Sequence, residues 1–110
     1  MSRAALFLYV RDPIDGDHIV AVRSSACIGR DLTCEVVVAD AEASRRHAEL
    51  LAVAGDRWQI HDLGSTNGTF VNERRVVGTV DVGAGDVVRV GRVSVELHAT
   101  DPTPADRLQP

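Results

Sequence analysis

Short apolar runs alternate with turn-forming residues along nearly the whole chain. Each run spans about two to six residues, and together they cover residues 6–10, 18–22, 27–28, 36–38, 48–53, 58–61, 69–71, 76–77, 80–82, 87–90 and 93–97. Within 93–97 apolar and polar residues alternate strictly, which is the period of a strand with one buried face. Turn signals at this spacing are typical of a β-sandwich or barrel. The pattern therefore predicts an all-β fold.

Two segments depart from this pattern. Residues 41–51 have local helical propensity, because Ala, Glu and Arg favour helices. Strands are predicted on both sides of them, so we interpret them as a loop that leads into a strand. Residues 101–110 contain three prolines and few apolar side chains. We therefore predict one domain over residues 1–98, followed by a flexible Pro-containing tail or linker over 99–110.

The composition narrows the classes of function. The length of 110 residues is that of one domain, and the net charge of −4 argues against a general nucleic-acid binder. No run approaches the roughly 20 apolar residues that span a membrane. The apolar run at 4–10 lacks a signal-peptide cleavage site and is followed directly by Arg11 and Asp12. A cytoplasmic location away from membranes is therefore expected.

The counts of cysteine and lysine exclude further chemistry. Cys27 and Cys34 are the only cysteines, so they cannot complete a zinc site, and we expect two free thiols in a reducing compartment. All basic residues apart from histidine are arginines. The absence of lysine excludes a P-loop lysine and a lysine Schiff base.

Three polar clusters lie between the predicted strands, at residues 29–30, 44–47 and 62–69. Their side chains are suited to an oxyanion. Arg30 offers a fork of donors that matches phosphate geometry. Ser44 and Thr66 offer hydroxyl donors, and Asn67 offers both a donor and an acceptor for a peptide backbone. Loops at one end of a rigid sandwich commonly gather such groups into one site.

Each cluster also has a plainer interpretation. An Asn67-Gly68 dipeptide by itself is most often a hairpin turn, and Arg45 and Arg46 by themselves are solvated charges. We interpret His47 as a structural histidine that braces its loop. The functional hypothesis therefore depends on the combination of the clusters and on their order.

In that order the chain resembles the forkhead-associated (FHA) family. The matching motifs are Gly29-Arg30, Ser44-x-x-His47, Asp62-Leu63-x-Ser65-Thr66-Asn67-Gly68-Thr69-x-Val71-Asn72 and Gly85-Asp86-Val87-x-x-x-Gly91. The resemblance covers residues 6–98. It implies a two-sheet sandwich of about eleven strands that binds phosphothreonine through loops at one end.

The resemblance also implies roles for individual residues. Arg30 and Ser44 match the main phosphate ligands of the family. Thr66 matches a further phosphate contact, and Asn67 matches the residue that binds the peptide backbone. Arg45 lies where the family varies and is a candidate for an additional contact. The positions that shape or brace the site are Gly29, His47, Ser65, Gly68 and Asn72, and the chain departs from the family at Glu73, where many members have glycine.

By the same resemblance the partners are phosphothreonine proteins made by Ser/Thr kinases, bound by a monomer in kinase signalling. No cofactor or metal is expected, since Asp12, Asp15 and Asp17 lack the spacing of a calcium loop and are better explained by a hairpin turn. Catalysis is not expected, because no G-x-S-x-G elbow surrounds Ser65. One alternative stays open, an FHA fold that contacts proteins without using phosphate. We also expect a basic end, formed by Arg30, Arg45 and Arg46 and joined by Arg74 and Arg75.

Overall fold

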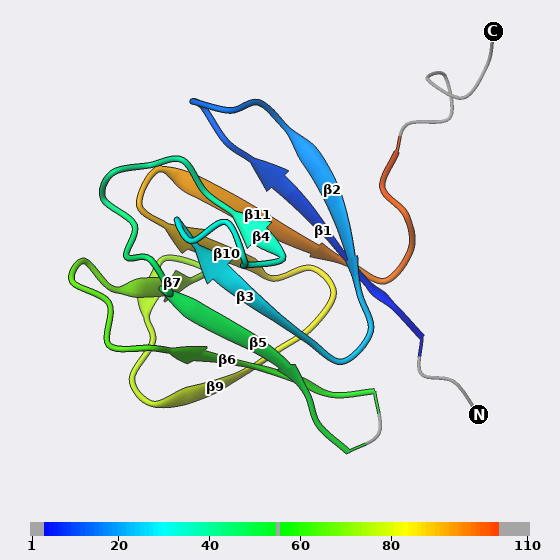
Figure 1. Cartoon of the computed structure of the whole chain (residues 1–110). Coiled ribbons are helices and arrows are strands. Elements are labelled where there is room, and N and C mark those ends of the chain that lie inside the picture. The colour runs from blue at the N-terminus through cyan, green and yellow to red at the C-terminus, as the bar shows by residue number, and fades with distance from the viewer. Residues whose placement is uncertain (1–3, 55, 104–110) are drawn as a thin grey trace, which may run out of the picture.

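The computed structural model describes residues 4–54 and 56–103, which form eleven strands (Figure 1). The strands are β1 (Leu6–Arg11), β2 (His18–Val22), β3 (Ser25–Gly29), β4 (Val36–Val37), β5 (Ala48–Ala52), β6 (Trp58–Asp62), β7 (Thr69–Val71), β8 (Arg74–Arg75), β9 (Thr79–Val82), β10 (Val87–Val90) and β11 (Val93–His98). The all-β prediction is confirmed. Segment 41–51 is a loop that enters β5, as predicted.

The strands form two sheets that pack as a sandwich. One sheet has the order β2-β1-β11-β10-β7-β8, and the other has the order β4-β3-β5-β6-β9. The burial of β1 and β11 alternates along the strand, so that one face of each enters the core. Leu8 and Leu97 of the first sheet meet Leu50 and Ile60 of the second in this core, and each is at most 1% exposed. The core is mostly aliphatic, as the low aromatic content requires, and it includes Trp58.

The pairing of β1 with β11 places the start of β1 and the end of β11 at one end of the sandwich, and the long loops lie at the other. The two strands are antiparallel, with Phe7 opposite His98. The turn from β10 to β11 lies at the other end, where Arg92 contacts the loop between β4 and β5. Figure 1 shows this separation. No helix that could cross a membrane occurs in the part of the chain that the structure describes.

The β1–β2 connection is the hairpin turn that the sequence suggests. Asp12 is buried, and its carboxylate accepts hydrogen bonds from the backbone N–H groups of Ile14 and Asp15 at 2.8 and 3.1 Å. This is the local role that Asp commonly takes in turns. Among residues 4–54 and 56–103, no group of three or more His, Cys, Asp or Glu side chains is placed to hold a metal ion.

One predicted strand is wrong. The sequence favours a strand at residues 76–77, whereas β8 consists of Arg74 and Arg75. The two-residue turn after β7 sets this register, because it places Arg74 directly opposite Val71. Val76 then leaves the strand with its side chain buried, and Val77 is 85% exposed. Backbone pairing therefore decides the position of this edge strand, and apolar character does not.

The turn from β7 to β8 has an unusual second residue. Asn72 and Glu73 both have positive φ angles, of 49° and 67°. This is the conformation of a type I′ hairpin turn, in which glycine is preferred at the second position. Glu73 pairs with Arg89 at 3.1 Å, but its side chain is 72% exposed, so the ion pair contributes little. Glu73 therefore adopts the left-handed conformation that the type I′ turn requires, although glycine is the residue preferred there.

Replacing Glu73 with glycine should stabilise the domain. A non-glycine residue in the left-handed region costs roughly 1–2 kcal/mol, and glycine recovers part of this. We expect Glu73→Gly to raise the free energy of unfolding by about 0.5–1 kcal/mol in urea denaturation. Glu73→Ala is the matched control, since it removes the ion pair but keeps the Cβ atom. A gain for alanine equal to that for glycine would contradict this explanation.

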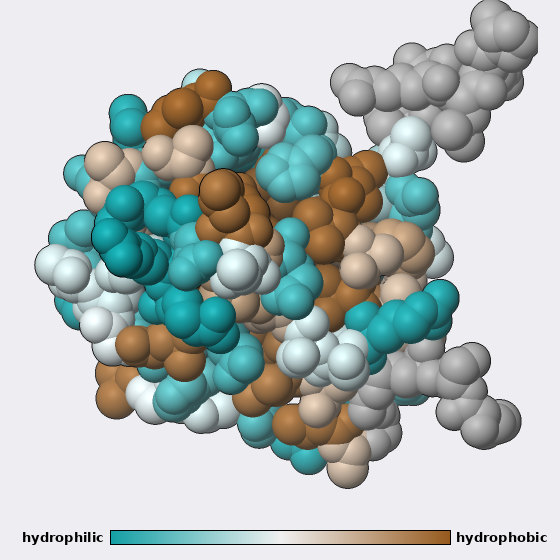
Figure 2. Space-filling model, viewed as in Figure 1, coloured by the Kyte–Doolittle hydropathy of each residue, from teal (hydrophilic) through white to brown (hydrophobic). Residues whose placement is uncertain are grey.

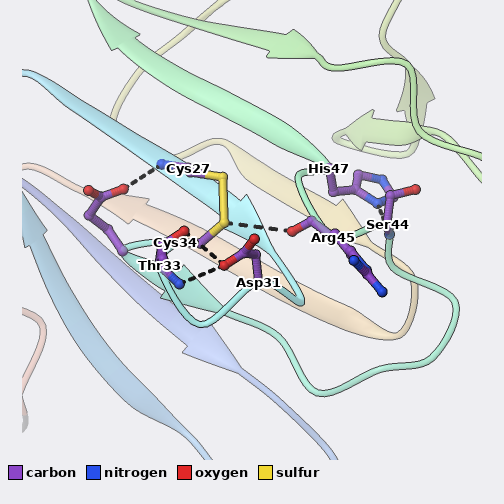
Figure 3. The surroundings of a disulfide bond; sticks show 8 residues. Cys27, Asp31, Thr33, Cys34, Ser44, Arg45 and His47 are labelled. Atoms are coloured by element: carbon purple, nitrogen blue, oxygen red, sulfur yellow. Dashed lines mark hydrogen bonds between the residues drawn. A yellow bond between two sulfur atoms is a disulfide. The ribbon is translucent and has the colours of Figure 1, made fainter.

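The expectation of two free thiols is also wrong, because Cys27 and Cys34 are joined by a disulfide. Figure 3 shows the bond between β3 and the loop that precedes β4. A turn closed by a 3.0 Å hydrogen bond from Cys34 N to Asp31 O brings the chain back, which leaves the two Cα atoms 4.7 Å apart. The sulfur of Cys34 lies 3.7 Å from the carbonyl oxygen of Arg45. The bond therefore closes the segment 27–34, which contains Arg30.

Candidate functional site

Three loops meet at the end of the sandwich opposite the start of β1 and the end of β11. They are residues 30–35 after β3, 38–47 after β4 and 63–68 after β6. Backbone hydrogen bonds join them, from Arg30 N to Ser44 O at 3.1 Å and from Leu63 N to His47 O at 3.0 Å. The surface on the left of Figure 2, where Figure 1 places the second and third loops, is mainly hydrophilic. The clusters found in the sequence are thus brought together.

His47 lies at the centre of this arrangement and is fully buried. Its Nδ1 accepts a hydrogen bond from Ser44 N at 3.0 Å, and its Nε2–H donates to the carbonyl oxygen of Gly68 at 2.8 Å. Because Nδ1 accepts a backbone N–H, it carries no proton, so the ring is neutral with its proton on Nε2. His47 therefore connects the second loop to the third and fixes the backbone on both sides of the cluster.

Gly29 permits the closest approach between two of the loops. A Cβ atom at this position would overlap the carbonyl oxygen of Arg45 and would lie 3.0 Å from His47 N. The backbone of residues 45–47 occupies the space that a side chain would need. Only glycine fits at the end of β3 without moving that backbone.

Arg30 directly follows this contact, and its side chain is exposed. Its Nε donates to the carbonyl oxygen of Ala43. Within residues 4–54 and 56–103 Arg30 makes no ion pair. The hydrogen bond through Nε fixes the direction of the guanidinium group and leaves the two terminal nitrogens, each with two N–H donors, for a ligand.

Ser44 and Thr66 face each other across the second and third loops. The hydroxyl oxygen of Ser44 accepts a hydrogen bond from Thr66 N at 3.2 Å. Its hydroxyl proton stays available for donation, because a serine hydroxyl can both accept and donate. The side chains of Thr66 and Arg45 are exposed beside it. A ligand at this end would therefore meet hydroxyl donors next to the guanidinium group of Arg30.

Asn67 is exposed, and its side-chain Nδ2 donates to the carbonyl oxygen of Glu42 at 2.7 Å. This contact orients the amide and leaves its oxygen free to accept, within the described residues. The loop of 63–68 joins β6 of one sheet to β7 of the other, and these strands do not pair. The Asn67-Gly68 dipeptide is therefore not a two-residue hairpin turn, and the plainer interpretation of it is wrong.

Sequence reasoning assigned no role to Asp62, which organises the third loop. Its carboxylate accepts hydrogen bonds from Gly64 N and Ser65 N at 3.0 Å each, from Ser65 Oγ at 2.5 Å and from Thr69 Oγ1 at 2.7 Å. Burial acts to raise the pKa of Asp62, but the hydrogen bonds from Ser65 and Thr69 outweigh it and lower that pKa. The signal was present in the sequence, since Asp before Gly and Ser commonly closes a turn.

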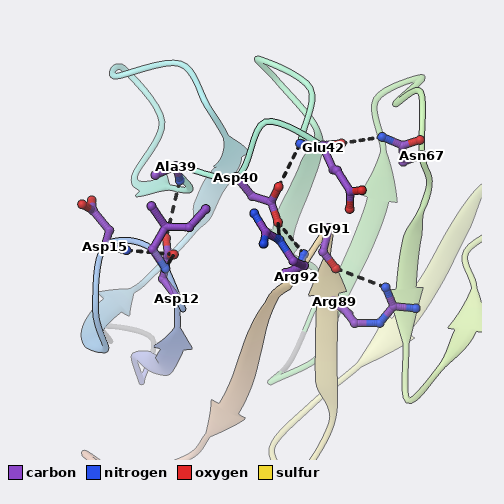
Figure 4. A network of polar contacts seen from close by, with 10 residues as sticks. Asp12, Asp15, Ala39, Asp40, Glu42, Asn67, Arg89, Gly91 and Arg92 are labelled. Atoms are coloured by element: carbon purple, nitrogen blue, oxygen red, sulfur yellow. Dashed lines mark hydrogen bonds and ion pairs between the residues drawn. The ribbon is translucent and has the colours of Figure 1, made fainter.

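Asp40 was also missed, and it anchors the second loop to the opposite sheet (Figure 4). It is fully buried and accepts hydrogen bonds from Glu42 N at 2.9 Å, from Arg92 N at 2.7 Å and from Arg92 Nε at 3.1 Å. The backbone N–H of Glu42 lowers the pKa of Asp40 most, and Arg92 contributes, although burial opposes them. The loop that carries Ser44 is thereby tied to the turn between β10 and β11.

Of the residues predicted to shape the site, Ser65 lies in the cluster of loops and Asn72 does not. Ser65 lies within the cluster, and its hydroxyl oxygen accepts a 3.0 Å hydrogen bond from Gly68 N. Asn72 lies outside it, at the far end of β7. There its side-chain oxygen accepts from Val87 N and its Nδ2 donates to Asp86, each at 3.0 Å. Asn72 therefore braces the β7–β8 turn against β10 and does not line the candidate site.

The side chains of the cluster have the chemistry that suits an oxyanion. Arg30, Ser44 and Thr66 lie on the three loops that meet here, and no described carboxylate pairs with Arg30. Charge-assisted hydrogen bonds from such groups suit a phosphate dianion. Asn67 adds an amide oxygen at the margin, which suits a peptide N–H.

The comparisons with known proteins agree with this geometry. The model of the FHA domain matches residues 26–91. The FHA domain-containing protein FhaB of Mycobacterium tuberculosis is 38% identical over 96 residues, which cover 86% of this chain and 61% of FhaB. The chain thus spans about three fifths of the length of that relative.

Solved structures share the fold. A domain from a structural and functional analysis of phosphothreonine-dependent FHA domain interactions has a TM-score of 0.75 and 31% identity, with 89% of this chain and 98% of that chain covered. EmbR of Mycobacterium tuberculosis, solved in complex with a low-affinity phosphopeptide, has a TM-score of 0.77 and 26% identity. The match covers 93% of this chain and 26% of EmbR. By its family model, its relatives and its sandwich of six and five strands, the chain belongs to the FHA domain family.

Proposed function

We propose that the chain is a phosphothreonine-dependent peptide-binding module. Arg30 and Ser44 are its main phosphate ligands, Thr66 is a further phosphate contact, and Asn67 binds the peptide backbone beside the phosphothreonine. One observation carries the proposal. The guanidinium group of Arg30 is fixed through Nε on Ala43 while its terminal nitrogens are left for a ligand. Arg45 is exposed in the loop that carries Ser44 and adds positive charge.

The chemistry of phosphothreonine matches these donors. The group carries about −1.5 to −2 charges at neutral pH and presents three strong acceptor oxygens. Arginine can bind two of these oxygens through parallel N–H donors, which a point charge cannot do. The FHA family is non-catalytic, so the module binds its ligand and does not transform it.

The partners we propose are proteins phosphorylated on threonine by Ser/Thr kinases. The module acts in the cytoplasm as a monomer, with no nucleic acid or membrane partner. The phosphopeptide complex of EmbR and the phosphothreonine-dependent interactions of another solved FHA domain support this class of ligand. β1 begins and β11 ends at the opposite end of the sandwich from the three loops, so neither of these strand ends covers them.

Substitutions at Arg30 test the proposal. Arg30→Ala removes two charge-assisted hydrogen bonds, each worth roughly 1.5–3 kcal/mol, and should weaken binding by about a hundredfold or more. Arg30→Lys should recover only part of that loss. The measurement is calorimetric titration with a phosphothreonine peptide selected from an oriented library. The melting temperature should hardly change, because the side chain is exposed.

Arg57→Ala is the matched control for charge. Arg57 makes an exposed ion pair with Asp81 beside the β5–β6 hairpin, away from the three loops. Its loss changes the net charge by the same amount and should leave the affinity within about twofold. Normal binding by Arg30→Ala would overturn the site and favour a contact module that does not use phosphate.

A further inference from the structure

Arg75 lies against the third loop, outside the set of residues that carry the proposed function. A Cβ atom on Gly68 would lie 3.1 Å from both Cζ and Nε of Arg75 and 3.3 Å from its Nη2. The guanidinium group therefore packs directly on the backbone of Gly68, the neighbour of Asn67. Gly68 has a φ angle of 90° and holds hydrogen bonds to Ser65 and His47, so this backbone is fixed.

The pairing of β7 with β8 explains this position. Arg75 lies directly opposite Phe70, and residues that face each other in an antiparallel pair project to the same side of the sheet. Gly68 precedes Phe70 by two residues and so lies on that side as well. Arg74 lies opposite Val71 and projects to the other side. The two neighbouring arginines thus differ in their access to the binding loop.

The charge of Arg75 is not neutralised by any residue in the described ranges 4–54 and 56–103. Its side chain is exposed and makes no ion pair there. The nearest aspartates around the adjoining surface pocket are committed elsewhere. Asp81 pairs with Arg57 and Gln59, and Asp86 accepts from Asn72 and Gly83 N. An exposed and unpaired guanidinium group that packs beside a peptide-binding residue is suited to an anion on the ligand.

We propose that Arg75 is a specificity-determining residue that binds an acidic side chain of the peptide close to the phosphothreonine. This inference rests on the proposed function. Thr66, Asn67 and Gly68 are consecutive, and an extended peptide advances about 3.3–3.6 Å per residue. The acidic residue therefore lies within about three positions of the phosphothreonine. A carboxylate of Asp or Glu and a second phosphate share the chemistry that Arg75 recognises.

The test moves a single aspartate through positions −3 to +3 of a phosphothreonine peptide with otherwise neutral flanks. At one position the aspartate should raise the affinity of the wild-type module about two- to fivefold, the upper part of the range for an exposed ion pair. Phosphoserine at that position distinguishes the two sources and should raise the affinity further, since it carries more charge. Arg75→Gln should abolish both gains and leave the neutral-flank peptide within about twofold.

Two variants keep the test specific. Arg74→Gln makes the same change of charge on the other side of the strand and should retain the gain from aspartate. Arg75→Glu should reverse the preference at that position from aspartate to arginine, which a merely structural role would not do. Equal loss of the gain in Arg74→Gln and Arg75→Gln, or no sensitive position in the wild type, would overturn the inference alone. Failure of every phosphothreonine peptide to bind would overturn the proposed function and the inference with it.

Discussion

A peptide whose threonine carries no phosphate is expected to bind more than about a thousandfold more weakly than its phosphorylated form. The phosphate supplies acceptors for the terminal nitrogens of Arg30 and for the hydroxyl groups of Ser44 and Thr66. Three or more charge-assisted hydrogen bonds, at roughly 1.5–3 kcal/mol each, account for that factor. Calorimetric titration of the two peptides is the measurement.

Two comparisons sharpen this result. A glutamate in place of the phosphothreonine should restore only a small part of the affinity, since it carries one charge and two oxygens in one plane. The affinity for the phosphopeptide should fall as salt rises, because Arg30, Arg45 and Arg46 are exposed and screening acts over about 8–10 Å. Equal affinities of the two forms, or an affinity indifferent to salt, would remove phosphate from the mechanism.

Gly29→Ala is expected to lower both stability and affinity. The added methyl group would overlap the carbonyl oxygen of Arg45, and backbone must move to relieve the overlap. Overpacking of this kind costs about 3 kcal/mol, a large share of the 5–15 kcal/mol that holds most domains folded. The affinity falls as well, because residues 45–47 directly follow Ser44, and Ser44 O accepts the backbone hydrogen bond of Arg30. Urea denaturation and peptide titration measure the two effects.

Gly83→Ala is the control for this substitution. A Cβ atom at Gly83 meets nothing within 4 Å, and the residue does not have a positive φ angle. Alanine there should be neutral or stabilise the domain by up to about 1 kcal/mol, because it restricts the unfolded chain. If Gly29→Ala behaved like Gly83→Ala, the close approach of the first two loops would not be what requires glycine.

Local patterns were sufficient for most of the fold. Strict alternation in strands such as β11 reports a buried face directly, and turn residues mark where each strand ends. Such patterns fail at β8. There the two-residue turn and the hydrogen bonds to β7 place Arg74 and Arg75 in the strand, although the adjacent valines favour strands more strongly. Edge strands are prone to this error because they pair with a single neighbour, whose register alone sets their position.

The site divides in the same way. Arg30, Ser44, His47 and Asn67 occur in ordered motifs that can be recognised in one sequence, whereas their supports depend on distant pairings. Asp40 acts through Arg92, 52 residues along the chain, and Arg75 acts on Gly68 through the register of a hairpin. The cysteine pairing needed the turn at 31–34, which no composition rule predicts. Contacts of this kind become visible only in three dimensions.

The hydrogen bonds that join the three loops determine the thermodynamic character of binding. Arg30, Ser44 and Asn67 each use one polar group on a neighbouring loop before any ligand arrives. The ordering of these side chains is therefore part of folding, and little conformational entropy is lost on association. Such a preorganised receptor changes shape little when it binds. A rigid site of this kind also cannot adjust to a ligand of different shape. Side chains at its margin must therefore discriminate among phosphorylated partners.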